Sequence, residues 1–551
     1  MFCFVFVSVL KSSIILSFIH ISLLFHSTGI GKNMHPHPVD PITLSIFPRY
    51  TYECGWCELF LFLNFELKLW NGSVSYSYWQ KPGVSRYTKV YIFNVTNPHG
   101  FLENGEKPKL VEVGPFVYRE YMEKVNVKFH DNDTVTFQHN KILRFVPEMS
   151  VDKNLKLVVP NIPLLTVTSF SSNLAGFLFN ILVSGLALTY KDRAKPFVYV
   201  TAEQLVFGYN DPLVSLAHIF YPKGKRPNSQ MGLLLARNGT LDEVSTIYAG
   251  NDLQKFGYLN RVNGLDRLPH WKHKPCNDIL ASEGSFFPPR DVTKSDTVYI
   301  YDKDLCRIMP MKYRSDVYKD HIKTNLYTPP SSMLESASIN DDNKCYCEGE
   351  QCPPRGLQNI SPCQYNAPVY LSFPHFFDAD PKLLTPFEGL KPEKEKHETY
   401  FMIQPKLGVP LEGFVRVQLN IKVDRAPNIR INQINQFPDI IFPVMWLEEG
   451  VHELTPSIWR WMFLATRVGP VAVPLLTYSM IIFGATILVI VFVKAYKKIV
   501  FSPKTEIYEI GRETIRRGST LIIQGAHKLM NDRETSYEPL EQLETPTIDM
   551  K

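Results

Sequence analysis

Six clustered cysteines and a long uncharged run downstream of them constrain this chain more than any other feature. The cysteines are Cys276, Cys306, Cys345, Cys347, Cys352 and Cys363. An even number of clustered cysteines indicates a disulfide framework, and disulfides persist in oxidising compartments. Residues 471–493 contain no Asp, Glu, Lys, Arg or His. At a rise of about 1.5 Å per residue, such a run crosses a hydrocarbon core of about 30 Å. Together they predict a membrane-anchored protein with a large extracellular or luminal domain.

Lysines directly after the uncharged run indicate the orientation of the chain. Lys494, Lys497 and Lys498 place residues 494–551 in the cytoplasm, because positively charged segments flanking a span stay on that side. Residues 71–468 then form the extracellular or luminal domain. Five N-glycosylation sequons agree with this placement. They begin at Asn71, Asn94, Asn132, Asn238 and Asn359.

The N-terminal part of the chain has two readings. Residues 1–25 are strongly apolar and are interrupted by Lys11 and His20, so they form a first transmembrane segment or a signal segment. Residues 26–70 are an atypical linker that holds Cys54 and Cys57. This pair is a redox or metal pair or, with no partnering motif nearby, a plain surface pair. Residues 157–190 are uncharged too, but their prolines and asparagines make a poor span, so we expect them inside the ectodomain.

Composition and motifs exclude several classes of function. The net charge of +5 is spread over 551 residues without a long Lys/Arg block, so nucleic acid is not an expected partner. The chain lacks a Gly-x-Ser-x-Gly elbow, a His-Glu-x-x-His motif and a phosphate-binding Gly-Lys-Ser/Thr loop. His397-Glu398 has no second histidine. We therefore expect no enzyme, no cofactor, no catalytic residue and no metal site.

Short β-like segments separated by turn residues dominate the ectodomain. They cover residues 89–93, 110–113, 116–118, 124–129, 134–138, 297–301, 369–373, 399–404 and 414–423. Residues 161–218 are predicted to be helical, with an apolar helix at 174–189 and a second helix at 202–207 that Thr201 caps. The predicted fold class is α+β: a mainly antiparallel β-domain with an inserted helical bundle.

Six short segments resemble the class B scavenger receptor family when they are taken in order. They are Val-Tyr-Ile-Phe-Asn-Val-Thr-Asn-Pro at 90–98, Gly-Glu-Lys-Pro-Lys-Leu at 105–110, Val-Gly-Pro-Phe-Val-Tyr-Arg-Glu at 113–120, Phe-Gly-Tyr-Asn-Asp-Pro at 207–212, Ser-Phe-Pro-His-Phe at 372–376 and Phe-Pro-Val-Met-Trp-Leu at 442–447. The resemblance runs from about residue 71 to residue 493. It implies an antiparallel β-barrel core, a helical-bundle apex at about 161–218, an apolar tunnel toward the bilayer and terminal transmembrane helices. The segment from 29 to 69 departs from the family pattern.

The resemblance also implies how the six cysteines pair. Composition alone leaves every connectivity open, whereas the family pattern implies Cys276–Cys345, Cys306–Cys363 and Cys347–Cys352. The first two would close long loops and each stabilise the fold by about 2–4 kcal/mol. A metal knuckle at Cys345, Cys347 and Cys352 is the competing interpretation.

Residues near the apex are candidate ligand contacts. Lys191, Arg193 and Lys195 follow the apolar helix, and the first two fall where a family member carries lysines linked to fatty-acid and lipoprotein binding. A cationic entrance would attract carboxylates and anionic lipoprotein, although a solvated turn after a helix has the same composition. Phe177 and Leu178 belong either to a buried helix or to an apolar docking surface.

The predicted function is a membrane receptor that binds lipoprotein or anionic lipid and passes fatty acid, cholesterol or cholesteryl ester through the tunnel. The alternative is a lysosomal sorting receptor for a luminal protein cargo. The family's lysosomal member uses an apical histidine for acid-sensitive release, but Phe177 stands near that place here. The predicted location is the plasma membrane or an endosomal or lysosomal membrane. Tyr537-Glu-Pro-Leu540 fits a sorting motif. A second copy of the chain is a further candidate partner.

Overall fold

The computed structural model describes residues 68–171, 185, 194–220, 228–347, 352–426, 433–500 and 504–534. The chain divides into two compact units, residues 1–75 and residues 76–551. Everything below concerns the second unit unless stated otherwise. The predicted N-terminal segment 1–25, the linker as far as residue 67 and the tail motif at Tyr537 and Leu540 lie outside the described residues.

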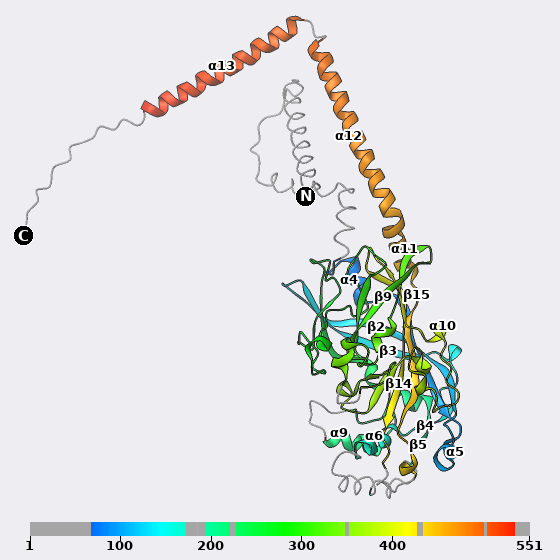
Figure 1. The fold of residues 1–551 in the computed structure, drawn as a ribbon. Helices are drawn as coiled ribbons and strands as arrows, with labels where there is room; N and C mark the ends of the chain where they lie inside the picture. The colour runs from blue at the N-terminus through cyan, green and yellow to red at the C-terminus, as the bar shows by residue number, and fades with distance from the viewer. Residues whose placement is uncertain are drawn as a thin grey trace, which may run out of the picture. The chain divides into compact units, whose positions relative to one another are not determined.

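One large antiparallel sheet dominates this unit (Figure 1). Its strands pair in the order β7-β6-β3-β2-β1-β15-β14-β13-β10-β9-β8, and β12 joins β14 and β11 beside this path. The strands are β1 (Val84–Val95), β2 (Leu110–His130), β3 (Thr134–Phe145), β6 (Gly239–Tyr248), β7 (Leu259–Val262), β8 (Thr297–Asp302), β9 (Arg307–Lys319), β10 (Ile322–Thr328), β11 (Gln358–Asn359), β12 (Val369–Ser372), β13 (Tyr400–Gln404), β14 (Val409–Val423) and β15 (Ile440–Leu454). This arrangement confirms the α+β prediction with a mainly antiparallel sheet.

The central strand β1 is buried on both faces, as its residues show. Val90 and Ile92 pack into one hydrophobic cluster, whereas Phe93 and Val95 pack into another. Successive side chains of a strand point to opposite faces, so both faces of the sheet are covered at this point. The aromatic and β-branched residues of this segment favour such a position.

The two end strands of the sheet are hydrogen-bonded to the same short segment. Leu259 in β7 donates its N–H to the carbonyl of Ala281 at 2.8 Å. The next residue, Ser282, donates to the carbonyl of Tyr299 in β8 at 2.9 Å and accepts from the N–H of Tyr301 at 2.8 Å. Residues 281–282 therefore connect the two ends of the strand order, and the path of backbone hydrogen bonds returns on itself.

A predicted turn proved to lie inside a strand. Gly114-Pro115 was expected to separate two segments, but β2 continues through it. A Cβ at position 114 would lie 2.8 Å from the carbonyl oxygen of Val90, so only glycine permits this approach of β2 to β1. The pairing register shifts between Val90 and Ile92, which absorbs the irregularity as a β-bulge does.

The predicted helical region at 161–218 is helical only in part. It contains α6 (Ile162–Ser171), α8 (Ala202–Phe207) and the start of α9 (Pro212–Phe220), but Phe197–Thr201 forms β5. This strand pairs with β4 (Lys156–Pro160) in a separate two-stranded sheet. The uniform helical prediction was therefore wrong at β5, where Phe-Val-Tyr-Val favours a strand. The cap at Thr201 is confirmed, since its side chain and that of Gln204 form a capping box.

The remaining α-helices are short, apart from two long ones near the C-terminus. They are α4 (Val74–Gln80), α5 (Pro98–Glu103), α10 (Lys394–His397), α11 (Pro456–Phe463), α12 (Gly469–Val500) and α13 (Lys504–Glu534), with a π-helical turn at Leu464–Val468. Within the described part of the chain, one helical stretch, Pro456–Lys498, is long and apolar enough to cross a membrane. The predicted span 471–493 lies inside α12.

Candidate functional site

A partly open cavity of about 210 Å³ is lined by residues of the large sheet. Its lining comes from β1, β2, β3, β6, β8, β9, β13, β14 and β15. Strands near both ends of the pairing order thus face one space. The closed path of hydrogen bonds through residues 281–282 explains how they do so.

The lining of this cavity is amphipathic. Its apolar side chains are those of Met122, Leu241, Ile300, Met309, Phe401, Val415, Val417, Leu447 and Val451. Its ionisable side chains are those of Arg86, His139, Lys141, Glu243, Tyr301, Asp302, Lys303, Asp304, Glu283, Glu412 and Glu449. Such a lining can accept an apolar chain along one part and a polar or charged group along another.

Glu449 is the centre of the main charged group in the wall. Its carboxylate lies 2.7 Å from Lys141 Nζ, 3.0 Å from Arg237 Nη1 and 3.5 Å from Arg86 Nη2. Glu120 lies 2.9 Å from Lys141 Nζ and 3.2 Å from Arg86 Nε. Burial opposes the charge on Glu449, but the three cations outweigh it and hold its pKa well below the usual range. The charges of this group are therefore ionised and paired.

A second charged group surrounds Lys124, whose side chain is fully buried. Its Nζ donates to the carbonyl of Trp79 at 3.1 Å and to Ser285 Oγ at 2.8 Å, and it lies 3.5 Å from Glu283. Glu283 also lies 3.3 Å from His139 Nε2. Burial, followed by the charge of Lys124, lowers the pKa of His139 to about 4. His139 is therefore neutral at both neutral and mildly acidic pH.

Lys303 differs from the other cations of the lining. Among the described residues it forms no ion pair with a carboxylate within 4.0 Å. Loss of solvent around its ammonium group, together with the charges of Arg237 and Lys141, lowers its pKa to about 8. This ammonium group is still mostly protonated at pH 7 and is available to an anionic ligand.

A group of two histidines and a carboxylate outside the cavity has the composition of a metal site but not its hydrogen bonding. The ligand atoms of Glu112, His375 and His397 lie within 4.8 Å of one another. His375 Nδ1 accepts the N–H of Lys391 at 3.0 Å, and His397 Nδ1 accepts the N–H of Glu393 at 2.9 Å.

These acceptor bonds place the hydrogen of each neutral ring on Nε2. A metal-bound histidine has the opposite arrangement, since its second nitrogen donates a hydrogen bond outward. Here His375 Nε2 lies 2.5 Å from Glu112 Oε2, and Trp446 Nε1 donates to the same oxygen at 2.7 Å. The hydrogen bonds from His375 and from Trp446 of β15 therefore fix the position of the Glu112 carboxylate.

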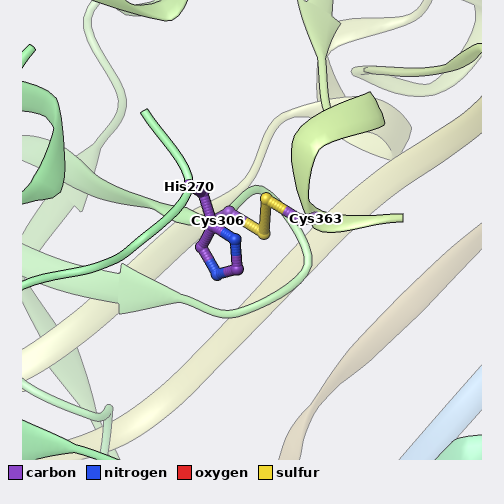
Figure 2. A group of neighbouring side chains, drawn as sticks. All are labelled: His270, Cys306 and Cys363. Carbon is purple, nitrogen blue, oxygen red and sulfur yellow. A yellow bond between two sulfur atoms is a disulfide. The ribbon is translucent and has the colours of Figure 1, made fainter. Parts of the chain in front are cut away.

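The six cysteines form three disulfides, Cys276–Cys345, Cys306–Cys363 and Cys347–Cys352. These are the pairs that the family pattern implies. Figure 2 shows His270 beside the Cys306–Cys363 bond, within 4.8 Å of both sulfurs. Sulfurs that are bonded to each other have no thiolate charge to offer a metal. The same argument opposes the metal knuckle at Cys345, Cys347 and Cys352.

The predicted apex residues are only partly within the described residues. Phe177, Leu178, Lys191 and Arg193 lie outside them. Lys195 is exposed and lies two residues before the start of β5. The apex assignment therefore stays a prediction.

The five sequons differ in accessibility. Asn71, Asn132 and Asn238 are exposed, whereas Asn94 and Asn359 are half-buried. Asn94 lies in β1 and accepts the N–H of Val158 at 2.8 Å. Asn132 lies at the β2–β3 turn, where a glycan would have room. We expect glycosylation first at the three exposed sites.

Sequence reasoning did not find the cavity wall. Glu449 and its partner Lys141 are 308 residues apart, and Glu449 and Arg86 are 363 residues apart. No local motif signals such pairs. None of these three residues lies within a predicted strand, so the sequence offered no signal for the pairs.

A disulfide-bonded, mainly antiparallel domain with an internal amphipathic cavity, followed by a helix that can cross a membrane, defines a class of membrane-anchored ectodomain proteins. Residues 54–495 match the family model described as the CD36 family. The chain is 30% identical to scavenger receptor class B member 1 of Bos taurus over 380 residues, which is 69% of this chain and 73% of that protein. It is 36% identical to lysosome membrane protein 2 of Mus musculus over 390 residues, 70% of this chain and 79% of that protein.

The chain therefore belongs to the CD36 family. Membership makes it a membrane protein of the class B scavenger receptor type, as the six sequence segments predicted. The predicted choice between the plasma membrane and an endosomal or lysosomal membrane agrees with these relatives and with the apolar helix α12.

Proposed function

We propose that this chain is a lipid receptor that passes fatty acid, cholesterol or cholesteryl ester through the sheet toward the membrane. The observation that carries the proposal is the amphipathic cavity lined by strands from both ends of the sheet. In this proposal the closed sheet is the β-barrel that the family resemblance implies, and the cavity is one section of its tunnel.

The size of the cavity supports passage rather than storage. Its 210 Å³ is below the roughly 300–1,000 Å³ of typical ligand pockets. A long lipid would therefore occupy it one section at a time. Each methylene that stays out of water is worth about 0.8 kcal/mol, so even a partly enclosed path favours transfer over release into water. Such transfer forms no covalent bond and uses no catalytic group or cofactor.

A blocked cavity tests this proposal. Val415 lines the cavity on β14, and Val415→Trp would fill part of it. Val111 on β2 is 49% exposed and does not line the cavity, so Val111→Trp is the matched control. Cells that express each variant at equal surface level would receive fluorescent fatty acid or cholesteryl ester in lipoprotein. We expect the first variant to lose most uptake and the control to keep it. If Val415→Trp kept as much uptake as Val111→Trp, passage through this cavity would be refuted.

A variant of Lys303 can show whether the cavity treats anionic and neutral lipids differently. Lys303→Met removes the ammonium group and keeps a long side chain. If the cavity takes fatty acids through their carboxylates, uptake of fatty acid falls while uptake of cholesteryl ester is unchanged. Equal effects on both lipids would mean that Lys303 does not choose between them.

The apex prediction is tested separately. We propose that Lys191, Arg193 and Lys195 attract anionic lipoprotein before its lipid enters the cavity. The triple variant Lys191→Ala/Arg193→Ala/Lys195→Ala should bind less lipoprotein than the parent. A variant that binds lipoprotein normally would remove the apex residues from the proposal and leave the cavity in place.

A lysosomal sorting receptor for a luminal protein cargo is the second candidate. The 36% identity to lysosome membrane protein 2 supports it, as does the predicted Tyr537–Leu540 sorting motif. The test is whether the ectodomain binds a lysosomal hydrolase at pH 7 and releases it at pH 5. Binding of this kind, together with no lipid uptake above that of untransfected cells, would move this candidate ahead of the first.

A further inference from the structure

The hairpin between β9 and β10 ends in a tight, well-defined tip. Asp320 and His321 form its two-residue turn, with φ values of 48° and 67°. Two successive residues with positive φ are typical of type I′ turns, whose twist matches that of the strands. Lys319 and Ile322 pair directly beside the turn. The tip is therefore a tight, hydrogen-bonded turn rather than an open loop.

Backbone carbonyls of this tip are bound by the segment that leads into the membrane-spanning helix. Trp459 Nε1 of α11 donates to the carbonyl of Asp320 at 3.2 Å. Arg467 donates to the carbonyl of His321 from Nε at 3.2 Å and from Nη2 at 3.0 Å. Three hydrogen bonds from two positions of the helical segment thus hold both turn residues.

The position of Arg467 sets the depth of the tip. Arg467 stands four residues before Val471, where the uncharged run begins. Four residues of helix correspond to about 6 Å. The polar layer on each side of a bilayer core is roughly 5–8 Å thick. Because Arg467 binds the tip directly, the tip lies at the depth of the lipid headgroups once α12 crosses the membrane.

The side chains around the tip suit that layer. Tyr318 is 66% exposed and Leu464 is 56% exposed. The rings of Trp459 and Phe463 stack 5.2 Å apart. Tyrosine and tryptophan concentrate at membrane interfaces, because their rings prefer the apolar side and their polar atoms prefer water.

Charge does not select the lipid at this surface. Lys319 pairs with Glu412 at 2.6 Å and Lys323 pairs with Asp316 at 2.7 Å. The exposed cations Arg460 and Arg467 and the exposed carboxylate of Asp320 leave a balance of one positive charge. One charge adds about 1 kcal/mol at an anionic surface, so aromatic partition is the main source of binding, and a zwitterionic surface is sufficient.

We propose that the β9–β10 tip, with Tyr318 at its side, is a membrane-surface anchor that inserts into the phospholipid headgroup layer. The anchor binds the outer or luminal leaflet of the bilayer that α12 crosses. The anchor attaches the sheet to the bilayer at a second point, besides the covalent connection through α11. This inference is independent of whether lipid passes through the cavity.

Two exposed tyrosines provide a matched test. A spin label would be attached at Tyr318→Cys or at Tyr199→Cys in the full chain, reconstituted into phosphatidylcholine nanodiscs. Tyr199 lies on β5 and is 68% exposed, so the two sites have equal exposure in the protein alone. The label that the parent chain takes up at Cys3, Cys54 or Cys57 is measured first and subtracted.

The readout is the ratio of collisions with oxygen, which concentrates in lipid, to collisions with a water-soluble nickel chelate. We expect this ratio at position 318 to be several-fold higher than at position 199. Ratios that are equal and typical of water would overturn the proposal. A second variant, Tyr318→Trp, keeps the test valid if the cysteine substitution disturbs the local structure. Brominated phosphatidylcholine should quench the fluorescence of the added tryptophan. Unquenched emission from a folded variant would also overturn the proposal.

Discussion

The cavity wall and the cysteine-rich region are stabilised in different ways. The wall consists of long paired strands such as β14 and β15, whose buried charges are matched by partners across the sheet. Among the described residues, the cysteines of the two long-range disulfides lie outside the strands. Cys276, Cys345 and Cys363 belong to the short 3₁₀ segments Lys274–Asn277, Asp341–Tyr346 and Ser361–Cys363, and Cys306 lies in the turn before β9. Where strand pairing fixes the backbone, the chain can accept charged groups in the interior. Where it does not, covalent bonds restrict the unfolded chain instead.

The largest expected effect comes from unpairing the cavity wall. Glu449→Ala removes the carboxylate that Arg86, Lys141 and Arg237 share, while Glu120 and Asp304 keep their own contacts with these cations. Removing one partner of a buried ion pair typically costs about 3–5 kcal/mol. Denaturant unfolding followed by tryptophan fluorescence would measure the free energy of unfolding.

The matched control is an exposed ion pair. Glu123 lies 3.0 Å from Lys81 at the surface, and Glu123→Ala should change the free energy of unfolding little. If the two variants had the same free energy of unfolding, the ion pairs of the cavity wall would not stabilise the fold more than an exposed pair does. The proposed difference between the two regions would then be wrong.

Disulfide removal should affect stability according to the length of the loop that each bond closes. Cys276–Cys345 spans 69 residues and Cys347–Cys352 spans 5. Chain-entropy estimates give about 4 kcal/mol for the long loop and about 2 kcal/mol for the short one. Paired Cys→Ser variants of each bond, compared by denaturant unfolding, would check the order. The reverse order would mean that these bonds do not act through the unfolded chain.

Acid should weaken the protein through histidines buried in a neutral form. The unfolded chain protonates a histidine near pH 6.5, whereas the pKa of His139 in the folded protein is about 4. The contribution of His139 is therefore fully present above pH 6.5 and is lost as the pH falls toward 4. Between pH 7 and pH 5 the loss is about 2 kcal/mol.

His139→Gln should reduce that pH dependence by the same amount. Unfolding at pH 7, 6 and 5 would compare this variant with the parent chain. An identical slope for His139→Gln and the parent would contradict the neutral, buried state of His139.

The smallest effect concerns a single hydrogen bond in the cysteine-rich region. Trp271 Nε1 donates to the carbonyl of Cys306 at 2.7 Å, next to the Cys306–Cys363 bond. Trp271→Phe leaves that buried carbonyl without its donor and should cost about 1–2 kcal/mol. A shift in thermal unfolding as large as that of Glu449→Ala would mean that packing, rather than disulfides, holds this region together.

Local patterns predicted the elements that local chemistry determines. The strand around residues 89–93 and the cap at Thr201 appeared where β-branched residues and a capping side chain indicate them. The strand β15 was not predicted, although its residues 442–447 were noticed as a family segment. It is buried almost continuously from Phe442 to Glu448. A strand covered on both faces loses the alternation by which strands are recognised.

The site depends on contacts that no local pattern encodes. His375 and Glu112 are 263 residues apart, and their contact exists because β2 and the turn after β12 meet at β15. The three cations around Glu449 come from β1, β3 and the segment before β6. The sequence could therefore predict the compartment, the disulfide framework and the family, but not which charges line the cavity.

Photocrosslinking tests the central claim, passage of lipid through the cavity, most directly. Cells that express the full chain would take up a long-chain fatty acid carrying a diazirine, and the crosslinked peptides would be mapped by mass spectrometry. The account predicts adducts on lining residues of β9, β13 and β15, such as Met309, Phe401 and Leu447. These adducts should disappear in Val415→Trp. Adducts confined to α12 or to the outer surface, with none in the lining, would contradict it.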